Sequence, residues 1–235
     1  MAVAHDDAAY QVGSPFETKK LGFERLVEYA RNLAIKRREN PIGDLTSTMA
    51  TSSIDGEPLS ELELGWNTMI FVVAGLETAR NAIAGGILAL DQHPEQLQQL
   101  RDNPALLKSA VEEILRWTSP AMHVRRTATC DAEVGGKQIK AGDWVVCWLP
   151  SANRDADVFA DPFRFDITRS PNRHVALGAG VHHCIGRDLA RLELHLTFKA
   201  LIQRGLQFKL TVEPERVQTN MVNGFKKMPA QLTRI

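Results

Sequence analysis

The sequence predicts a mainly α-helical fold with a small antiparallel β region, in one compact domain over residues 1–235. Three observations carry this prediction. A long apolar stretch covers 66–90, segments opened by proline follow it as far as 117, and a run rich in Val, Ile and Thr with two turn signals covers 124–149. The composition is globular, with 44% hydrophobic and 24% charged residues, and the sequence contains no internal repeat or low-complexity segment.

The charge balance and the N-terminus narrow the class of protein. The chain carries 28 Lys and Arg against 28 Asp and Glu, so its composition gives no sign of a nucleic-acid partner. Residues 1–15 contain acids where a secretory signal needs a basic start and an apolar core, and we therefore expect a cytoplasmic protein. The three cysteines, Cys130, Cys147 and Cys184, form no disulfide framework, and reduced thiols agree with that compartment.

The first predicted helix covers 17–39. Its apolar side chains form an imperfect helical stripe, and Pro41 and Gly43 end it. The stripe consists of Leu21, Leu26, Tyr29, Leu33 and Ile35.

The longest predicted helix covers about 61–90. Ser60 and Glu63 have the spacing of a capping box, and the helix ends before Pro94. Glu77 and Arg80 lie near the centre of the apolar stretch, where charges are costly in a bilayer, so we interpret it as a buried helix of a soluble protein and expect no membrane span. At 1.5 Å per residue it is roughly 45 Å long and crosses a whole domain.

Two shorter helices and a β region complete the pattern. Pro94 and Pro104 each suit a first helical position, which predicts a helix from 94 and a core helix over about 104–117. In 124–149 the two turn signals are Gly135-Gly136 and Ala141-Gly142-Asp143, and they separate antiparallel strands. A loop with several Asp, Pro and Arg residues fills 150–173.

The stretch HVALGAGVHHCIGRDLARLEL, residues 174–194, places one cysteine between glycines and a helix. Gly178, Gly180 and Gly186 allow the backbone to approach something flat or bulky. Cys184 lies just before a helix, whose dipole and unpaired N–H groups stabilise a thiolate that can ligate a metal. A buried structural cysteine is the simpler alternative. A zinc site is also open, although no second ligand pair has a zinc-site spacing.

Three further features accompany this loop. The segment AGLET, 74–78, places Gly75 and Thr78 inside the long helix, where they can bend it and leave a polar notch, unless they serve only helix packing. Glu113 and Arg116 are three residues apart on one helix face and can pair. Arg125 and Arg126 begin a strand and either bind a carboxylate or form a solvated charge pair.

In this order, over residues 20–230, these features resemble the haem-thiolate monooxygenases of the cytochrome P-450 superfamily. The pattern Gly178-x-Gly180-x-His182-x-Cys184-x-Gly186 resembles the family's haem-binding loop, here 177–186, which implies that Cys184 is the axial iron ligand of haem b. Leu177 stands where the family usually has phenylalanine beside the sulfur. The family's domain has a substantial part before the segment that begins here, so the resemblance implies a partial domain.

The resemblance also implies roles for the other site residues. Glu113 and Arg116 match the pair of the family's core helix, and Arg164 in DPFRFD matches the third member of their salt-bridged network. Arg126, rather than Arg125, and His182 are the expected partners of the haem propionates. Glu77 and Thr78 resemble the acid–alcohol pair that delivers protons during oxygen activation.

The implied function is a monooxygenase that inserts one oxygen atom from O2 into a C–H bond of a lipophilic substrate of the sterol, branched-lipid or terpenoid class. A ferredoxin and an NAD(P)H-dependent reductase are the implied electron donors, and they are expected near Arg173, Arg187 and Arg191, where solvated surface arginines are the alternative. The alternative function is a truncated fragment that retains the motifs but binds haem poorly. The residues expected around the substrate are mostly apolar: Val72, Val73, Ala74, Met122, His123, Val124, Met221 and Val222.

Overall fold

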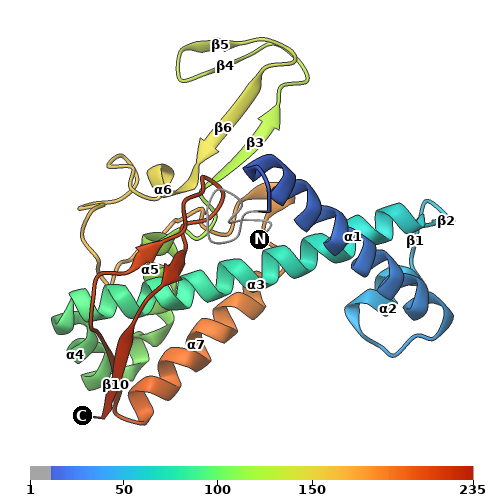
Figure 1. Cartoon of the computed structure of the whole chain (residues 1–235). Coiled ribbons are helices and arrows are strands. Elements are labelled where there is room, and N and C mark those ends of the chain that lie inside the picture. The colour runs from blue at the N-terminus through green and yellow to red at the C-terminus, as the bar shows by residue number, and fades with distance from the viewer. Residues whose placement is uncertain (1–11, 235) are drawn as a thin grey trace. The chain divides into compact units, whose positions relative to one another are not determined.

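The computed structural model describes residues 12–234 (Figure 1). The N-terminal stretch on which the secretory-signal prediction depends, 1–11, lies outside the described residues. The chain divides into two compact units, with the boundary between Glu77 and Thr78 inside one continuous helix, α3 (Glu61–Gln92). The single domain over 1–235 therefore stays a prediction, and each unit is described by itself.

The first unit is built on α1 (Pro15–Glu39), which begins two residues before the predicted start. Ser14 and Glu17 form a capping box there, and Pro15 occupies the first helical position. The predicted stripe is half-buried except for Tyr29, which is exposed, and the fully buried residues of α1 are Thr18, Ala30 and Ala34. Small side chains let α2 (Leu45–Ala50) approach closely, and Ala34, Ala50 and Leu64 form a small core.

The first half of α3 also belongs to this unit. The predicted capping box is confirmed, since the Glu63 carboxylate accepts from the Ser60 N–H at 2.8 Å and the Ser60 hydroxyl accepts from the Glu63 N–H at 3.3 Å. A short hairpin, β1 (Ser53–Ile54) and β2 (Glu57–Pro58), precedes it. The described residues cover this half of the predicted buried helix only in part, because one face exposes Leu62, Trp66, Ile70, Val72 and Leu76. By length and composition α3 is apolar enough to cross a membrane, a property that core helices of soluble proteins share.

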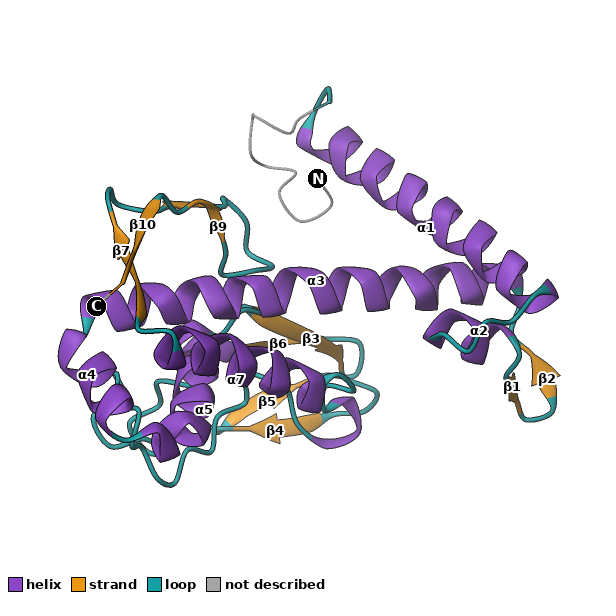
Figure 2. Ribbon diagram, turned by 90° about the horizontal axis from the view of Figure 1, so that it is seen from below, coloured by secondary structure: helices purple, strands orange, loops and turns teal. Residues whose placement is uncertain are grey.

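In the second unit, the rest of α3 lies on α5 (Leu107–Thr118) and α7 (Arg187–Gln203) (Figure 2). Close packing requires glycine at two positions, because a Cβ on Gly85 would lie 2.5 Å from the Thr118 side chain and one on Gly86 2.7 Å from Phe198. The predicted helices after residue 93 are confirmed as α4 (Pro94–Asp102) and α5, with a 3-10 turn, η2 (Pro104–Leu106), before α5. The core of this unit contains Leu90, Leu100, Ile114, Phe165, Ile167, Leu194 and Phe198.

The β region consists of two-stranded antiparallel sheets, as the sequence predicted for 124–149. There β3 (His123–Thr127) pairs with β6 (Trp144–Trp148), and β4 (Ala132–Val134) pairs with β5 (Lys137–Ile139) across the Gly135-Gly136 turn. Two further sheets join β7 (Leu206–Leu210) to β10 (Ala230–Arg234) and β8 (Glu215–Arg216) to β9 (Phe225–Lys227). One turn of helix, α6 (Leu149–Ala152), opens the predicted loop, which leads to the cysteine loop and its 3-10 turn, η3 (Gly180–His182).

Candidate functional site

The cysteine loop is closed by its own backbone. The Cys184 N–H donates to the Leu177 carbonyl at 2.8 Å, and the Gly178 N–H donates to the Val175 carbonyl at 2.9 Å. Gly178 and Gly180 have φ values of +71° and +65°, which a side chain rarely adopts. The loop therefore needs both glycines to return the chain on itself and set Cys184 at the start of α7.

The sulfur of Cys184 is a free, half-buried thiol beside apolar surface. Val181 and Ile185 are 99% and 78% exposed, and Leu189 is also exposed on the first turn of α7. A Cβ on Gly186 would lie 4.0 Å from the Cys184 sulfur, so the glycine keeps that side of the sulfur open. A thiol with uncovered apolar neighbours and little bulk beside it suits a flat, apolar prosthetic group.

The side chains that could ligate a metal beside Cys184 decide whether zinc or haem iron fits there. Among residues 12–234, no group of three or more His, Cys, Asp or Glu residues could hold a metal ion. A structural zinc site needs about four protein ligands, whereas haem iron brings four ring nitrogens and needs one axial ligand from the chain. The residues around Cys184 therefore fit haem and do not fit zinc.

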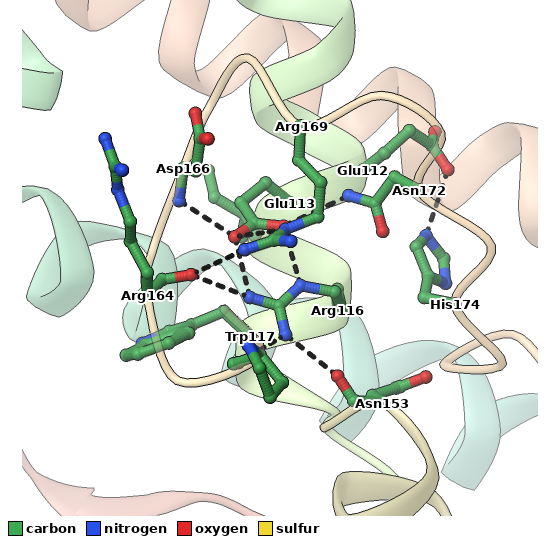
Figure 3. A network of polar contacts seen from close by, with 12 residues as sticks. Glu112, Glu113, Arg116, Trp117, Asn153, Arg164, Asp166, Arg169, Asn172 and His174 are labelled. Atoms are coloured by element: carbon green, nitrogen blue, oxygen red, sulfur yellow. Dashed lines mark hydrogen bonds and ion pairs between the residues drawn. The ribbon is translucent and has the colours of Figure 1, made fainter. Parts of the chain in front are cut away.

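The predicted pair on α5 forms a buried ion pair (Figure 3). The Arg116 Nε and Nη2 donate to the two carboxylate oxygens of Glu113 at 2.7 Å each, and both side chains are fully buried. Arg169 Nε lies 3.2 Å from Glu113 Oε2, and Asn172 Nδ2 donates to the same oxygen at 3.1 Å. The two guanidinium groups share one carboxylate in a bidentate arrangement that satisfies a charge which burial would otherwise make costly.

The structure corrects the third member of this network. Arg164 was expected to supply a guanidinium, but it supplies its backbone carbonyl, which accepts from Arg116 at 3.1 Å and from Arg169 at 2.9 Å (Figure 3). The third side chain of the network, beside Glu113 and Arg116, is that of Arg169. Arg116 also donates to the carbonyls of Asn153 and Pro162, at 2.8 and 2.9 Å. The network therefore fastens the loop that precedes the cysteine to α5.

Glu112, next to Glu113, holds residues on both sides of the cysteine. His174 Nε2 lies 3.0 Å from Glu112 Oε2, and Arg191 of α7 donates to both carboxylate oxygens at 2.7 and 3.0 Å. Burial opposes ionisation of Glu112, but the hydrogen bonds from His174 and Arg191 outweigh it and lower the pKa of this carboxyl to about 2. Sequence reasoning missed Glu112, Arg169 and the role of His174, although His174 lies in the stretch that the motif identified.

The expected propionate partners lie on exposed segments of the second unit. Arg125 stacks on Trp144 of the neighbouring strand, with its guanidinium carbon 4.2 Å from the ring centroid. Arg126, whose side chain points to the other face of β3, donates to the Arg125 carbonyl at 2.8 Å and forms no ion pair with any residue in 12–234. His182 is exposed in η3. Arg126 and His182 therefore remain able to bind carboxylates, whereas Arg125 is engaged.

The expected substrate residues of the second unit come together at the start of β3. The Met122 N–H donates to the Met221 carbonyl at 3.0 Å, His123 Nδ1 lies 2.9 Å from the Asn220 carbonyl, and Ala121 forms a β-bridge with Val222. The segment after Val222 reaches α3, where Asn81 Oδ1 accepts from the Phe225 N–H at 3.4 Å. Val124 is the second residue of β3, and half-buried Thr78 lies about one helical turn before Asn81.

The remaining predicted residues lie elsewhere. Val72, Val73, Ala74 and Glu77 are on the part of α3 that belongs to the first unit, and the structure does not place that unit against the second. Of the arginines expected to meet a redox partner, Arg173 is exposed and Arg187 lies 3.9 Å from Asp188. Arg191 is held by Glu112 and is not a solvated surface charge.

Comparisons with known proteins agree on one family. The family model described as Cytochrome P-450 matches residues 19–233. A methyl-branched lipid omega-hydroxylase of Mycobacterium bovis is 44% identical over 203 residues, which cover 86% of this chain and 47% of that protein. Linalool 8-monooxygenase of Pseudomonas putida is 38% identical over 226 residues, covering 96% of this chain and 55% of that protein.

A solved structure supports the same relationship. The chain resembles a Mycobacterium marinum cytochrome P-450 in complex with pseudoionone, with a TM-score of 0.90 at 36% identity, covering 97% of this chain and 56% of that one. The chain thus spans about half the length of the relatives it matches.

Proposed function

Because the chain belongs to the cytochrome P-450 family, we propose that it forms the haem-binding part of a monooxygenase in which the Cys184 thiolate ligates the iron. The observation that carries the proposal is the cysteine loop itself, which presents one half-buried thiol before a helix and beside uncovered apolar side chains. No group of three or more candidate metal ligands occurs among the described residues. Arg126 and His182 are the proposed partners of the haem propionates. Haem with a thiolate ligand supplies, when bound, the activation of O2 and insertion of one oxygen atom into a C–H bond.

The chain's own residues keep the thiolate anionic and in place. Cys184 lies three residues before Arg187, the first residue of α7, where the helix dipole and unpaired N–H groups favour negative charge on the sulfur. The Arg187 N–H and side chain both donate to the Cys184 carbonyl, at 3.2 and 3.4 Å, and fix the turn into the helix. The apolar neighbours exclude water from the sulfur once they are covered.

Proton delivery is assigned to neighbouring residues of α3. Thr78 carries a hydroxyl that can both donate and accept a proton, and Glu77 carries a carboxyl that can exchange with solvent. Glu77 and Thr78 are adjacent and half-buried, which gives a relay access to both the interior and water. In this proposal Glu77 takes up protons from solvent and the Thr78 hydroxyl passes them on to the substrate side.

The proposed substrate is lipophilic, of the branched-lipid, terpenoid or sterol class. Met122, Met221 and Val222 supply apolar side chains where β3 meets the 220–222 turn. The names of two relatives, a methyl-branched lipid omega-hydroxylase and linalool 8-monooxygenase, agree with such a substrate. A ferredoxin and an NAD(P)H-dependent reductase are the proposed electron donors, and the proposed compartment is the cytoplasm.

A second candidate function is that of a fragment that keeps the motifs but holds haem poorly. The exposed apolar face on the first half of α3 and the partial coverage of the relatives favour it. Reconstitution with excess haem separates the two candidates, since the monooxygenase proposal requires the chain to take up one haem through Cys184 when haem is supplied, whereas the fragment would retain little.

The test of the monooxygenase proposal uses isotopically labelled O2 with the haem-loaded protein, electron donors and a branched lipid or terpenoid. One labelled oxygen atom should enter each product molecule, and a product without label would overturn the proposal. Thr78→Ala should divert electrons to peroxide while substrate binding stays unchanged. Thr78→Ser, which keeps the hydroxyl, is the matched control and should restore coupling of electron use to product.

A further inference from the structure

The Glu112 carboxylate joins three parts of the second unit that are distant in the sequence. It projects from α5 and binds His174, which precedes the cysteine loop, and Arg191, which follows that loop on α7. Both ends of the segment that contains Cys184 are therefore held by one carboxylate. We name Glu112, His174 and Arg191 the loop clamp.

We propose that Glu112 is a positioning residue for the cysteine ligand, because the loop clamp fixes both ends of the Cys184 loop on α5. This inference rests on the proposed function, in which Cys184 ligates haem iron. Glu112 does not touch the sulfur and acts on it through His174 and Arg191. The loop clamp reduces local opening of the loop and keeps the sulfur at one place at the start of α7.

The hydrogen bonds of His174 define its role in the loop clamp. The Ala176 N–H donates to His174 Nδ1 at 3.3 Å, which makes Nδ1 an acceptor and leaves Nε2 to donate to Glu112. The His174 side chain is 4% exposed, so the imidazole end of this pair is shielded from water. His174 thus transmits the position of Glu112 to the backbone immediately before Leu177, whose carbonyl accepts from the Cys184 N–H.

The ionised state of Glu112 supports a role as a permanent clamp. Its pKa of about 2 leaves it charged throughout the neutral range, and each of its bonds to Arg191 is charge-assisted. Arg191 also lies 3.9 Å from Asp188, a much longer contact than its 2.7 Å bond to Glu112. The ion pair borders a groove of about 530 Å³ between α5 and α7, which Lys108, Asp188 and His195 also line.

Glu112 and Glu113 have different tasks although they are neighbours. Glu113 is fully buried and holds the 164–172 loop through two arginines, whereas the Glu112 side chain is 25% exposed beside the groove. A Glu112 variant can therefore lose the loop clamp while the buried network keeps the fold. Next to the loop clamp, the Val175 N–H donates to Asn153 Oδ1 at 2.7 Å, and Asn172 is held by Glu113 at 3.1 Å.

The test measures the accessibility of the Cys184 thiol in the haem-free full chain. Cys130→Ser and Cys147→Ser first remove the two exposed thiols, so that iodoacetamide reports Cys184 alone. Glu112→Gln should raise the alkylation rate of Cys184 roughly tenfold at constant pH, because charge-assisted hydrogen bonds no longer oppose local opening. Asp131→Asn, which removes an exposed 2.7 Å ion pair with Lys140 on the β4–β5 hairpin, is the matched control and should leave the rate unchanged.

Conservative variants separate positioning from general destabilisation. Arg191→Lys keeps a cation for Glu112 and should retain most of the protection, whereas Arg191→Gln should approach the Glu112→Gln rate. If Glu112→Gln does not fold, the comparison of Arg191→Lys with Arg191→Gln still tests the positioning role. Equal alkylation rates for Arg191→Lys and Arg191→Gln, or an unchanged rate in Glu112→Gln, would overturn the proposal.

The haem-loaded protein gives a second readout. Glu112→Gln should lose part of the reduced carbon-monoxide band from which the family takes its name, and Asp131→Asn should keep all of it. A full band in Glu112→Gln would also overturn the positioning role. Alkylation is measured without haem, so its result stands even if Cys184 proves not to ligate iron. The two experiments therefore distinguish failure of the positioning role from failure of the proposed function.

Discussion

The two halves of α3 have similar apolar sequences but different surroundings. In the second half, Ala82, Leu88 and Leu90 are buried, and Gly85 and Gly86 admit side chains of α5 and α7. In the first half Leu64 and Met69 are buried, yet Leu76 is 65% exposed. An apolar helical sequence therefore shows that burial is favoured but does not identify the residues that provide it.

The exposed part of the first half is a continuous stripe. Leu62, Trp66 and Ile70 are four residues apart, so their side chains lie on one helix face, and all three are exposed in the described structure. A stripe of large apolar side chains is typical of a surface that another segment or molecule covers. The following predictions test whether the two halves differ in solution as they do in the structure.

The largest expected effect is on association of the 235-residue chain. Fully burying a large apolar side chain contributes about 1.5–3 kcal/mol, so the stripe should drive self-association at micromolar concentration and accompany low haem content. Replacing Leu62, Trp66 and Ile70 by Gln should weaken association by more than about tenfold in sedimentation experiments. A wild-type chain that is monomeric, fully haem-loaded and melts cooperatively would contradict this prediction.

A matched pair of leucines compares the halves directly. Leu90→Ala should lower the free energy of unfolding by about 2–5 kcal/mol, because Leu90 is 5% exposed and its loss leaves a cavity. Leu76→Ala should change it by less than about 0.5 kcal/mol. Urea unfolding of both variants checks the difference, and equal losses would mean that the first half is covered in solution.

Alanine substitution at two glycines of α3 should change the free energy of unfolding in opposite directions. A Cβ on Gly86 would lie 2.7–2.8 Å from Phe198 and Ile114, so Gly86→Ala should destabilise by about 1–3 kcal/mol through overpacking. Gly75 has nothing within 4 Å of an added Cβ, and Gly75→Ala should stabilise the helix by about 0.5–1 kcal/mol. Thermal melts measure both, and destabilisation by Gly75→Ala would show that the first half packs against something.

The smallest predicted effect concerns acid stability of the two units. The pKa of Glu112 lies below its ordinary value of 4.5, so its ion pairs stabilise the fold above about pH 4.5 and are lost as the pH falls through about 2. Glu112→Gln should remove about 1 kcal/mol of this pH dependence, since solvent screening reduces the full linkage effect. In the first unit, hydrogen bonds from Ser47 and Arg37 lower the pKa of Asp44 to about 2. The Asp44 side chain is 36% exposed, more than that of Glu112, so Asp44→Asn should change the acid limb less. Urea titrations between pH 2 and about 5 compare the two variants, and an equal loss of acid stability in both would contradict the prediction.

Local signals predicted the helices and the cysteine loop well. Ser60 with Glu63, Pro94 and Pro104 are signals within one turn of the backbone they affect, and the start of α3, of α4 and of the 3-10 turn before α5 agrees with them. The glycines of the loop likewise act on their own φ angles.

Partners that are distant in the sequence could not be predicted from such local signals. Whether Arg164 presents its guanidinium or its carbonyl to Arg116 depends on how the 153–172 loop folds back on α5. The bonds of Glu112 to His174 and Arg191 are equally a product of tertiary structure, because three distant segments must meet before one carboxylate can join them. The exposed face of α3 could not be located from the sequence for the same reason, since an apolar pattern predicts burial without identifying the residues that provide it.

The central claim is that Cys184 is the thiolate ligand of haem, and the reduced carbon-monoxide spectrum tests it most directly. The haem-reconstituted chain should show the band that names the family, with equal amplitude per haem in Cys130→Ala and Cys147→Ala, whose thiols are exposed elsewhere in the second unit. In Cys184→Ala that band should disappear, while the melt of the haem-free chain stays near that of the wild type. An unchanged band in Cys184→Ala, or its loss in either control variant, would contradict the account.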